Sequence, residues 1–222
     1  MTATLRVLGV VVAGAVALAL LQPAVERAVR ADGRLTTSDG DTVDITEPAR
    51  SAGLRFRADV APADREWVLA AIARARPEAG RLIDEVDGLV EIGVFSDPGT
   101  TLGVTRSEPE GFAVDLNLGY LNGERGADRA TVVLHELGHV IDFALVSGAT
   151  NARLDAQIPR GGACGLAIDC DRPEERFADT FAKWALNGAV SEAGAGYGIA
   201  MPASLEDWGA PLSQLSFRLP AA

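Results

Sequence analysis

Two histidines and a glutamate, close enough to share one site, are the residues of this chain best suited to chemistry. His135, Glu136 and His139 follow the pattern H-E-x-x-H in the segment T-V-V-L-H-E-L-G-H-V-I-D-F-A. Residues four apart on an α-helix lie on one face, so both imidazoles can bind the same metal ion. The carboxylate of Glu136 can reach a water at that metal. A catalytic zinc takes three protein ligands and lowers the pKa of its water to about 7, so the pattern favours zinc-dependent hydrolysis.

The composition argues against a chance match. The chain contains 2 histidines, and both belong to this motif. Random placement would give this spacing, with Glu after the first His, in about one such chain in a thousand. A buried helix tolerates these polar groups only when partners satisfy them, as a metal would. The alternative is that protein groups alone satisfy the histidines. The helix is predicted to be buried because its neighbouring residues are apolar: Val132, Val133, Leu134, Leu137, Val140, Ile141 and Leu145.

A second helix is predicted downstream of the motif. The metzincin pattern is excluded, because Leu145 stands six residues after His139, where that pattern has His or Asp. The segment D-R-P-E-E-R-F-A-D-T-F-A-K-W begins like a helix, with Asp171 as N-cap, Pro173 in the first turn and Glu174 completing a capping box. It is also predicted to place three aromatic side chains in the core: Phe177, Phe181 and Trp184.

Glu175 is the predicted third ligand on this second helix. Glu175, Ala178, Asp179 and Ala182 share one face at helical spacing. The carboxylate of Glu175 can bind the metal, Asp179 can hold one of the histidines, and the small alanines let the two helices approach closely. Acidic residues are common at helix N-termini, which is enough to explain Glu174. The E-x-x-x-D spacing favours a metal-binding role for Glu175.

The two motifs together resemble a known group of enzymes. H-E-L-G-H-V-I-D-F followed by E-R-F-A-D-T-F is similar to the Glu-zincin (gluzincin) group, thermolysin-like in its ligands, and closest to the catalytic domain family of anthrax lethal factor. The resemblance covers about residues 129–186. It implies a zinc metallopeptidase of zincin-like fold, with His135, His139 and Glu175 as ligands and Glu136 as general base.

One departure from that family concerns the residue that stabilises the oxyanion. The family has a tyrosine shortly before the ligand glutamate, whereas this chain has I-D-C-D-R-P there. Tyr120 and Tyr197 are the chain's only tyrosines. Tyr197 is the favoured substitute, because it follows the ligand helix.

Residues 1–31 are predicted to be a signal peptide or an N-terminal membrane anchor. Residues 7–25 carry no charge and follow Arg6. This run is long for the apolar part of a signal peptide and only just spans a bilayer. The small-residue rule permits cleavage after Ala31. The flanking arginines do not orient the segment. We expect a secreted or membrane-anchored protein with its catalytic domain outside the cytoplasm.

The remainder is expected to form a linker, 32–53, and one α+β domain, 54–222. Helices are predicted from Ala61 and from Pro77, and residues 147–172 are expected to be mostly loop. The predicted strands are Leu89 to Phe95, Thr101 to Thr105 and Gly111 to Leu118, with a short strand at Thr42 to Ile45 in the linker.

Two further features of this domain are predicted, one for its sheet and one for its C-terminal end. Phe112 to Leu118 is predicted to be the sheet edge beside the metal helix, to which an extended substrate could pair. A short helix S-L-E-D-W and a tail are expected to close the chain.

Cys164 and Cys170 are the chain's only cysteines, and they lie shortly before Glu175. In an exported protein they are expected to form a disulfide that closes a small loop. Free thiols in a cytosolic protein, or metal ligands, are the competing interpretations, the latter poorly supported without C-x-x-C spacing.

The formal net charge of -11 argues against a nucleic-acid partner, which requires a basic surface. Protein or peptide substrates are expected instead. The first functional hypothesis is a zinc endopeptidase. The second is a catalytically inactive zinc-binding domain of the cell envelope, supported by the missing tyrosine and opposed by Glu136. The third is a structural domain that needs no metal.

Overall fold

The computed structural model describes residues 34–36, 42–44, 53–99, 101–122, 128–160, 172–189 and 198–219. The chain divides into two compact units, Met1–Ala49 and Arg50–Ala222. In the first unit, β1 (Arg34–Thr36) pairs antiparallel with β2 (Thr42–Asp44), so the predicted linker strand is present. The apolar segment 7–25 lies outside the described residues. Among the helices that are described, none is long and apolar enough to cross a membrane.

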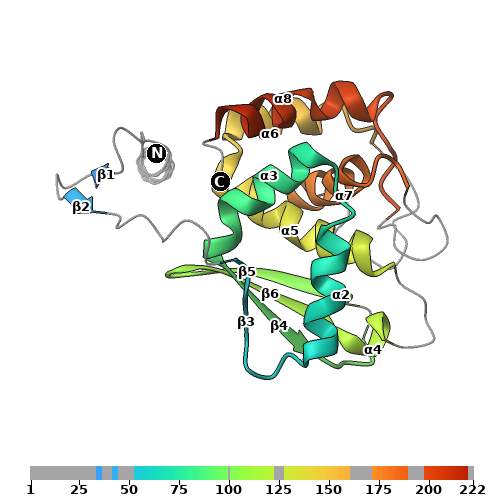
Figure 1. Ribbon diagram of the computed structural model, residues 1–222. Coiled ribbons are helices and arrows are strands. Elements are labelled where there is room, and N and C mark those ends of the chain that lie inside the picture. Colours follow the sequence, from blue (N-terminus) through green and yellow to red (C-terminus); the bar gives the residue numbers. More distant parts are fainter. Residues whose placement is uncertain are drawn as a thin grey trace, which may run out of the picture. The chain divides into compact units, whose positions relative to one another are not determined.

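The second unit combines a four-stranded sheet with helices, which confirms the predicted α+β class (Figure 1). Its strands are β3 (Arg55–Phe56), β4 (Val90–Phe95), β5 (Gly103–Glu108) and β6 (Gly111–Asn117). Its helices are α2 (Pro62–Ile72), α3 (Pro77–Val86), the 3-10 turn η1 (Asp87–Leu89), α4 (Leu118–Leu121), α5 (Arg129–Leu145), α6 (Gly148–Asp155), α7 (Pro173–Ala185) and α8 (Leu205–Arg218).

The sheet is mixed, and its strands lie in the order β3-β4-β6-β5. β3, β4 and β6 run parallel, whereas β5 is antiparallel to β6. The prediction that Phe112 to Leu118 forms the edge is therefore wrong, since β6 lies between β4 and β5. β6 is suited to the interior because its second half is buried on both faces, whereas β5 carries the polar run R-S-E, which suits an edge strand.

Asn117 anchors the connection that leads into β5. This fully buried side chain donates from Nδ2 to the carbonyl oxygens of Asp97 (3.0 Å) and Thr101 (2.8 Å), and its Oδ1 accepts from the backbone of Asp97 and Gly119. The backbone N–H of Asn117 donates to the carbonyl of Leu102 at 2.9 Å. One amide thus satisfies backbone groups on both sides of the connection, which fixes where β5 begins.

A chain of ion pairs joins the strands on the face of the sheet that the helices do not cover. Asp115 of β6 is buried and pairs with Arg106 of β5 and with Arg57, whose Nη2 lies 2.7 Å from Oδ1. Arg57 reaches Asp115 by crossing Gly93 of β4, where a Cβ would lie 2.1 Å from the guanidinium carbon. Gly93 is therefore required for this contact.

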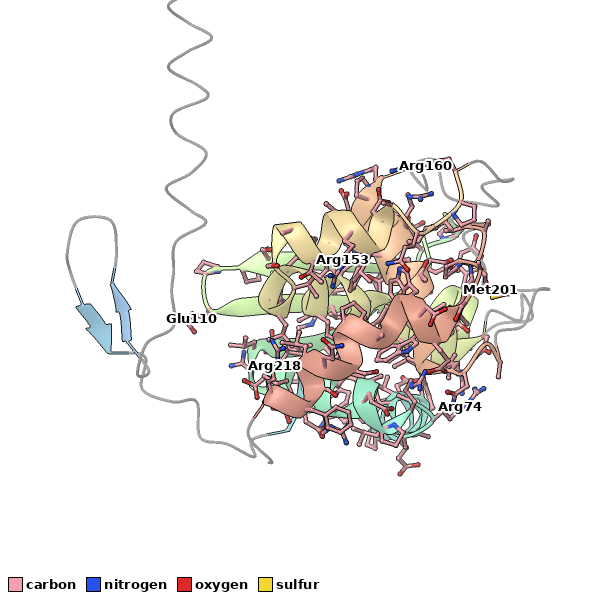
Figure 2. The ribbon with its side chains drawn as sticks, turned by 90° about the horizontal axis from the view of Figure 1, so that it is seen from above. Arg74, Glu110, Arg153, Arg160, Met201 and Arg218 are labelled. Atoms are coloured by element: carbon pink, nitrogen blue, oxygen red, sulfur yellow. The ribbon has the colours of Figure 1, made fainter. Side chains whose placement is uncertain are left out.

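The helices cover the other face of the sheet, and α5 lies directly against it (Figure 1). α5 contacts β5 and β6 on one side and α7 on the other, and α2 and α3 also pack on it. Seen from above, α6 and α8 lie over the strands, and the turn between β5 and β6, where Glu110 lies, extends beyond the helices (Figure 2). The predicted aromatic core residues Phe177, Phe181 and Trp184 are all buried.

The segment expected to be mostly loop, 147–172, contains α6, whose N-cap Ser147 accepts from the backbone of Thr150. Two further predictions need correction. The expected short helix near the C-terminus is α8, which continues through Pro211 to Arg218. The N-cap of α7 is Arg172, with Pro173 as the first helical residue and no side-chain cap, so the capping box predicted with Asp171 is wrong.

Gly209 allows α8 to pack on the core. A Cβ at this position would lie 2.0 Å from Nε1 of Trp184, whose ring is fully buried and tilted by 53° against that of Phe181. The indole of Trp208, in the preceding position, donates to the carbonyl of Leu154 at 3.2 Å, which ties α8 to α6.

We expect Gly209→Ala to lower the free energy of unfolding by about 1 to 3 kcal/mol, because the added methyl overlaps a rigid buried ring. Gly80→Ala is the matched control: it also lies within a helix, but its Cβ would meet nothing within 4 Å. That change should raise the free energy of unfolding by about 0.5 to 1 kcal/mol through helix propensity. Denaturant titration measures both, and equal effects would contradict the packing argument.

Candidate metal centre

Helix α5 places both histidines of the motif inside the protein. Its N-cap Asp128 accepts from the backbone of Ala130 at 2.9 Å, and the helix then runs 17 residues. Its residues from Ala130 to Asp142 are buried, because sheet and helices cover it on several sides. His135 and His139 therefore lie one turn apart on a buried helix.

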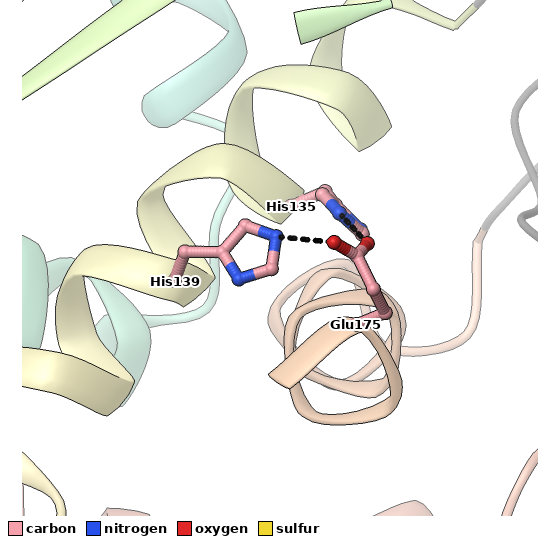
Figure 3. Close-up of side chains that lie close together, drawn as sticks. All are labelled: His135, His139 and Glu175. Carbon is pink, nitrogen blue, oxygen red and sulfur yellow. Dashed lines mark ion pairs between the residues drawn. The ribbon is translucent and has the colours of Figure 1, made fainter. Parts of the chain in front are cut away.

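Glu175 of α7 meets both imidazoles, as the sequence predicts (Figure 3). Nε2 of His135 lies 3.3 Å from Oε2 of Glu175, and Nε2 of His139 lies 3.6 Å from Oε1. The imidazole rings are nearly perpendicular, at 84°. One ligand atom from each residue lies within 4.8 Å of the others, so these three residues could hold a metal ion.

Close packing of α5 and α7 brings the carboxylate within reach. A Cβ at Gly138 would lie 3.0 Å from Cα of Ala178, so at this point the helices touch through backbone. Arg176 fixes α7 from its other side and is itself buried. Its guanidinium pairs with Asp155 at 2.6 Å and donates to the carbonyl of Ile158 at 2.6 Å.

The electrostatics of the group favour an ionised carboxylate. Burial would raise the pKa of Glu175, but the hydrogen bonds and charges of His135 and His139 lower it far below the ordinary value. Burial would lower the pKa of His139, yet Glu175 beside it and the charges of Glu136 and Asp142 raise the pKa above 6.5.

Glu136 is held against the edge strand β5. The hydroxyl of Thr105 lies 2.8 Å from Oε2 of Glu136 and 3.0 Å from its backbone oxygen. Gly103 leaves room for the carboxylate, because a Cβ there would lie 2.6 Å from Oε1. The position of the Glu136 side chain is therefore determined by β5 as much as by α5.

Asp179 is fully buried on α7, one turn after Glu175. Its Oδ2 accepts from Lys183, whose Nζ also donates to the carbonyl of Ile199 at 2.5 Å. Among the described residues, Oδ1 of Asp179 has no hydrogen-bond partner. The sequence predicts a contact between Asp179 and a histidine, whereas the contact that the structure defines is an ion pair with Lys183 within the same helix.

The remaining predicted residues are placed as follows. Glu174 pairs with Arg172 at the start of α7, consistent with an ordinary helix-terminal acid. Tyr120 is buried in α4. Tyr197, Cys164 and Cys170 lie outside the described residues, so the predicted oxyanion stabiliser and disulfide stay predictions.

Sequence reasoning missed three residues that position this site: Thr105, Arg176 and Lys183. Lys183 carried a usable signal, because it follows Asp179 by four residues in a predicted helix. Thr105 and Arg176 act on partners 31 and 21 residues away in the chain, and no local pattern indicates such contacts.

No protein-family model, curated protein or solved structure matches this chain.

Metal affinity is expected to fall as the pH falls, because protons compete with the metal for His139. The raised pKa of His139 means that competition begins above the ordinary value of 6.5, whereas Glu175, whose pKa is lowered, stays ionised. Below the pKa of His139, apparent affinity should drop about tenfold per pH unit for each proton displaced. Chelator competition with Zn²⁺ from about pH 5.5 to about pH 8 measures this slope.

Glu175→Gln is the control for that experiment. It removes the charge that raises the pKa of His139, so affinity should be lower overall and its decline should begin at a lower pH. An affinity that stays constant below about pH 6.5 would contradict the ligand assignment of His139.

Proposed function

We propose that this chain is a zinc-dependent endopeptidase with a zincin-like catalytic domain, secreted or anchored through residues 7–25 with that domain outside the cytoplasm. The observation that carries the proposal is the buried group of His135, His139 and Glu175, with Glu136 oriented beside it. The antiparallel edge strand next to α5 and the ligand on a second helix further support the fold assignment. The export signal rests on the sequence alone.

The donor set fits zinc. Two imidazole nitrogens and one carboxylate are ligands of catalytic zinc sites, in which a fourth position stays open. Ligands bound at 2.0 to 2.2 Å around a tetrahedral centre lie about 3.4 Å apart. Each imidazole nitrogen lies near this distance from one oxygen of Glu175: 3.3 Å from Oε2 for His135 and 3.6 Å from Oε1 for His139.

Each residue of the site then has a defined role in peptide hydrolysis. His135, His139 and Glu175 would hold the ion, which supplies Lewis acidity that activates water and polarises the scissile carbonyl. Glu136 accepts the proton of the attacking water and passes it to the leaving amine. Thr105 keeps the Glu136 carboxylate in place for both transfers. Tyr197 is the proposed donor to the developing oxyanion.

β5 offers a natural place for an extended substrate. It ends the sheet in the part of the chain that the structure describes, and it touches Glu136. An extended peptide can add to such an edge through main-chain hydrogen bonds. The substrate is therefore proposed to be a protein or peptide bound in extended form along β5.

We expect Glu136→Gln to retain zinc and to lose turnover, because the amide cannot accept the proton. His139→Ala and Glu175→Ala should lose both zinc and turnover. Mass spectrometry of a diverse peptide mixture detects cleavage, and metal analysis of the same samples gives zinc content. A fully active Gln variant would refute the general-base role, whereas zinc retention without any cleavage by the wild type would favour a binding domain.

Thr105→Val should slow turnover by about 10- to 100-fold, because a hydrogen bond to a charged group contributes about 1.5 to 3 kcal/mol. Zinc content should not change, since Thr105 contacts none of the three ligands directly. Thr105→Ser retains the hydroxyl and should stay within a few-fold of the wild type. Steady-state rates on one cleaved peptide compare the variants, and a Val variant as fast as the wild type would remove Thr105 from the mechanism.

A further inference from the structure

Two phenylalanines extend the metal centre along α5. Phe143 follows His139 by one helical turn, and their rings stack with centroids 6.0 Å and planes 20° apart. Phe112 of β6 stacks in turn with Phe143, with centroids 6.4 Å and planes 21° apart. The three rings thus form a continuous row from a metal ligand to the sheet. We refer to Phe112 and Phe143 as the aromatic ledge.

Phe143, the part of the ledge that lies on α5, is open to solvent, although most of that helix is buried. Phe143 is 52% exposed, whereas α5 is buried from Ala130 to Asp142. Single exposed apolar residues are common and need no explanation. Phe143 differs because it is part of a stacked row that ends on His139, so an apolar group bound there would lie beside the reacting bond.

The register of the sheet indicates which part of a bound peptide would contact the aromatic ledge. Glu136 lies against Gly103 and Thr105, near the start of β5, whereas Phe112 is paired with Ser107, near its end. A peptide added antiparallel to β5, the slightly more stable pairing, runs from Ser107 toward Gly103. Its N-terminal part therefore passes the ledge before the chain reaches Glu136.

Distances along the two elements limit which substrate residue is involved. Phe143 lies four residues, about 6 Å, beyond His139 along α5. An extended peptide advances about 3.3 Å per residue. The side chain that meets the ledge thus belongs to a residue one or two positions from the scissile bond.

We propose that the aromatic ledge binds an aromatic or large aliphatic substrate side chain, one or two residues N-terminal to the bond that is cleaved. The inference rests on the proposed peptidase function and adds the class of substrate. Flat ring faces stack well on Phe, Tyr and Trp side chains and accept Leu and Met. Carboxylate side chains are disfavoured, because the negative faces of the two rings repel them and offer no hydrogen-bond donor.

The test begins with cleavage sites mapped in a peptide mixture, followed by two peptides that differ only in Phe or Ala at the inferred position. The wild type should prefer the Phe peptide in kcat/KM by about 10- to 100-fold. Phe143→Ala should reduce that ratio about tenfold. Metal analysis of the same variant, with zinc retained, separates a loss of recognition from damage to His139.

Phe217→Ala is the matched control, because Phe217 of α8 is 70% exposed and stacks on Arg81 instead of a metal ligand. It should leave the ratio unchanged. A ratio insensitive to Phe143→Ala, or a preference confined to the C-terminal side of the scissile bond, would overturn the proposal.

Binding measurements distinguish failure of the proposed peptidase function from failure of the proposed ledge. Calorimetry with the zinc-loaded Glu136→Gln variant measures affinity for the two peptides without turnover. If the wild type cleaves nothing, stronger binding of the Phe peptide that is lost on adding Phe143→Ala supports the ledge without the peptidase. Equal binding of the two peptides overturns the ledge.

Discussion

The backbone contact between Gly138 of α5 and Ala178 of α7 is the constraint on which the rest of the site depends. The distance between packed helices is set by the side chains at their contact, and here one partner has none. Glu175 lies one turn before Ala178, and His139 follows Gly138 directly. A wider spacing would move the carboxylate away from both imidazoles, so the small residues matter as much as the three ligands.

The sheet contributes to the site through its edge rather than its core. Successive side chains of a strand point to opposite faces of the sheet. On β5, Thr105 therefore lies on the face toward α5 and Arg106 on the opposite face. Thr105 orients Glu136, while Arg106 pairs with buried Asp115 and fastens the strand to β6. Asn117 fixes the point where β5 begins. The edge strand is thereby rigid at the place where a substrate would add to it.

Much of this arrangement could be predicted from the sequence, where the signal is local. The H-E-x-x-H spacing and the E-x-x-x-D spacing both depend on helical periodicity, and His135, His139 and Glu175 meet as predicted. The order of the strands could not be predicted. β5 and β6 share the alternating period of a strand, and they differ only in which strands lie beside them. Arg176 and Thr105 were missed for a related reason: their partners are distant in the chain. Helix α6 has no strong apolar period, so its segment resembles a loop.

The ion pair of Asp179 and Lys183 also limits how this sequence can change. Both side chains are buried in one helix, one turn from Glu175. Loss of either partner would leave a single charge in the interior, which is far more costly than having the pair or replacing both with apolar residues. Substitutions at positions 179 and 183 should therefore occur together during divergence. Descendants of this chain would keep the acid and the lysine as a unit or exchange both for apolar side chains.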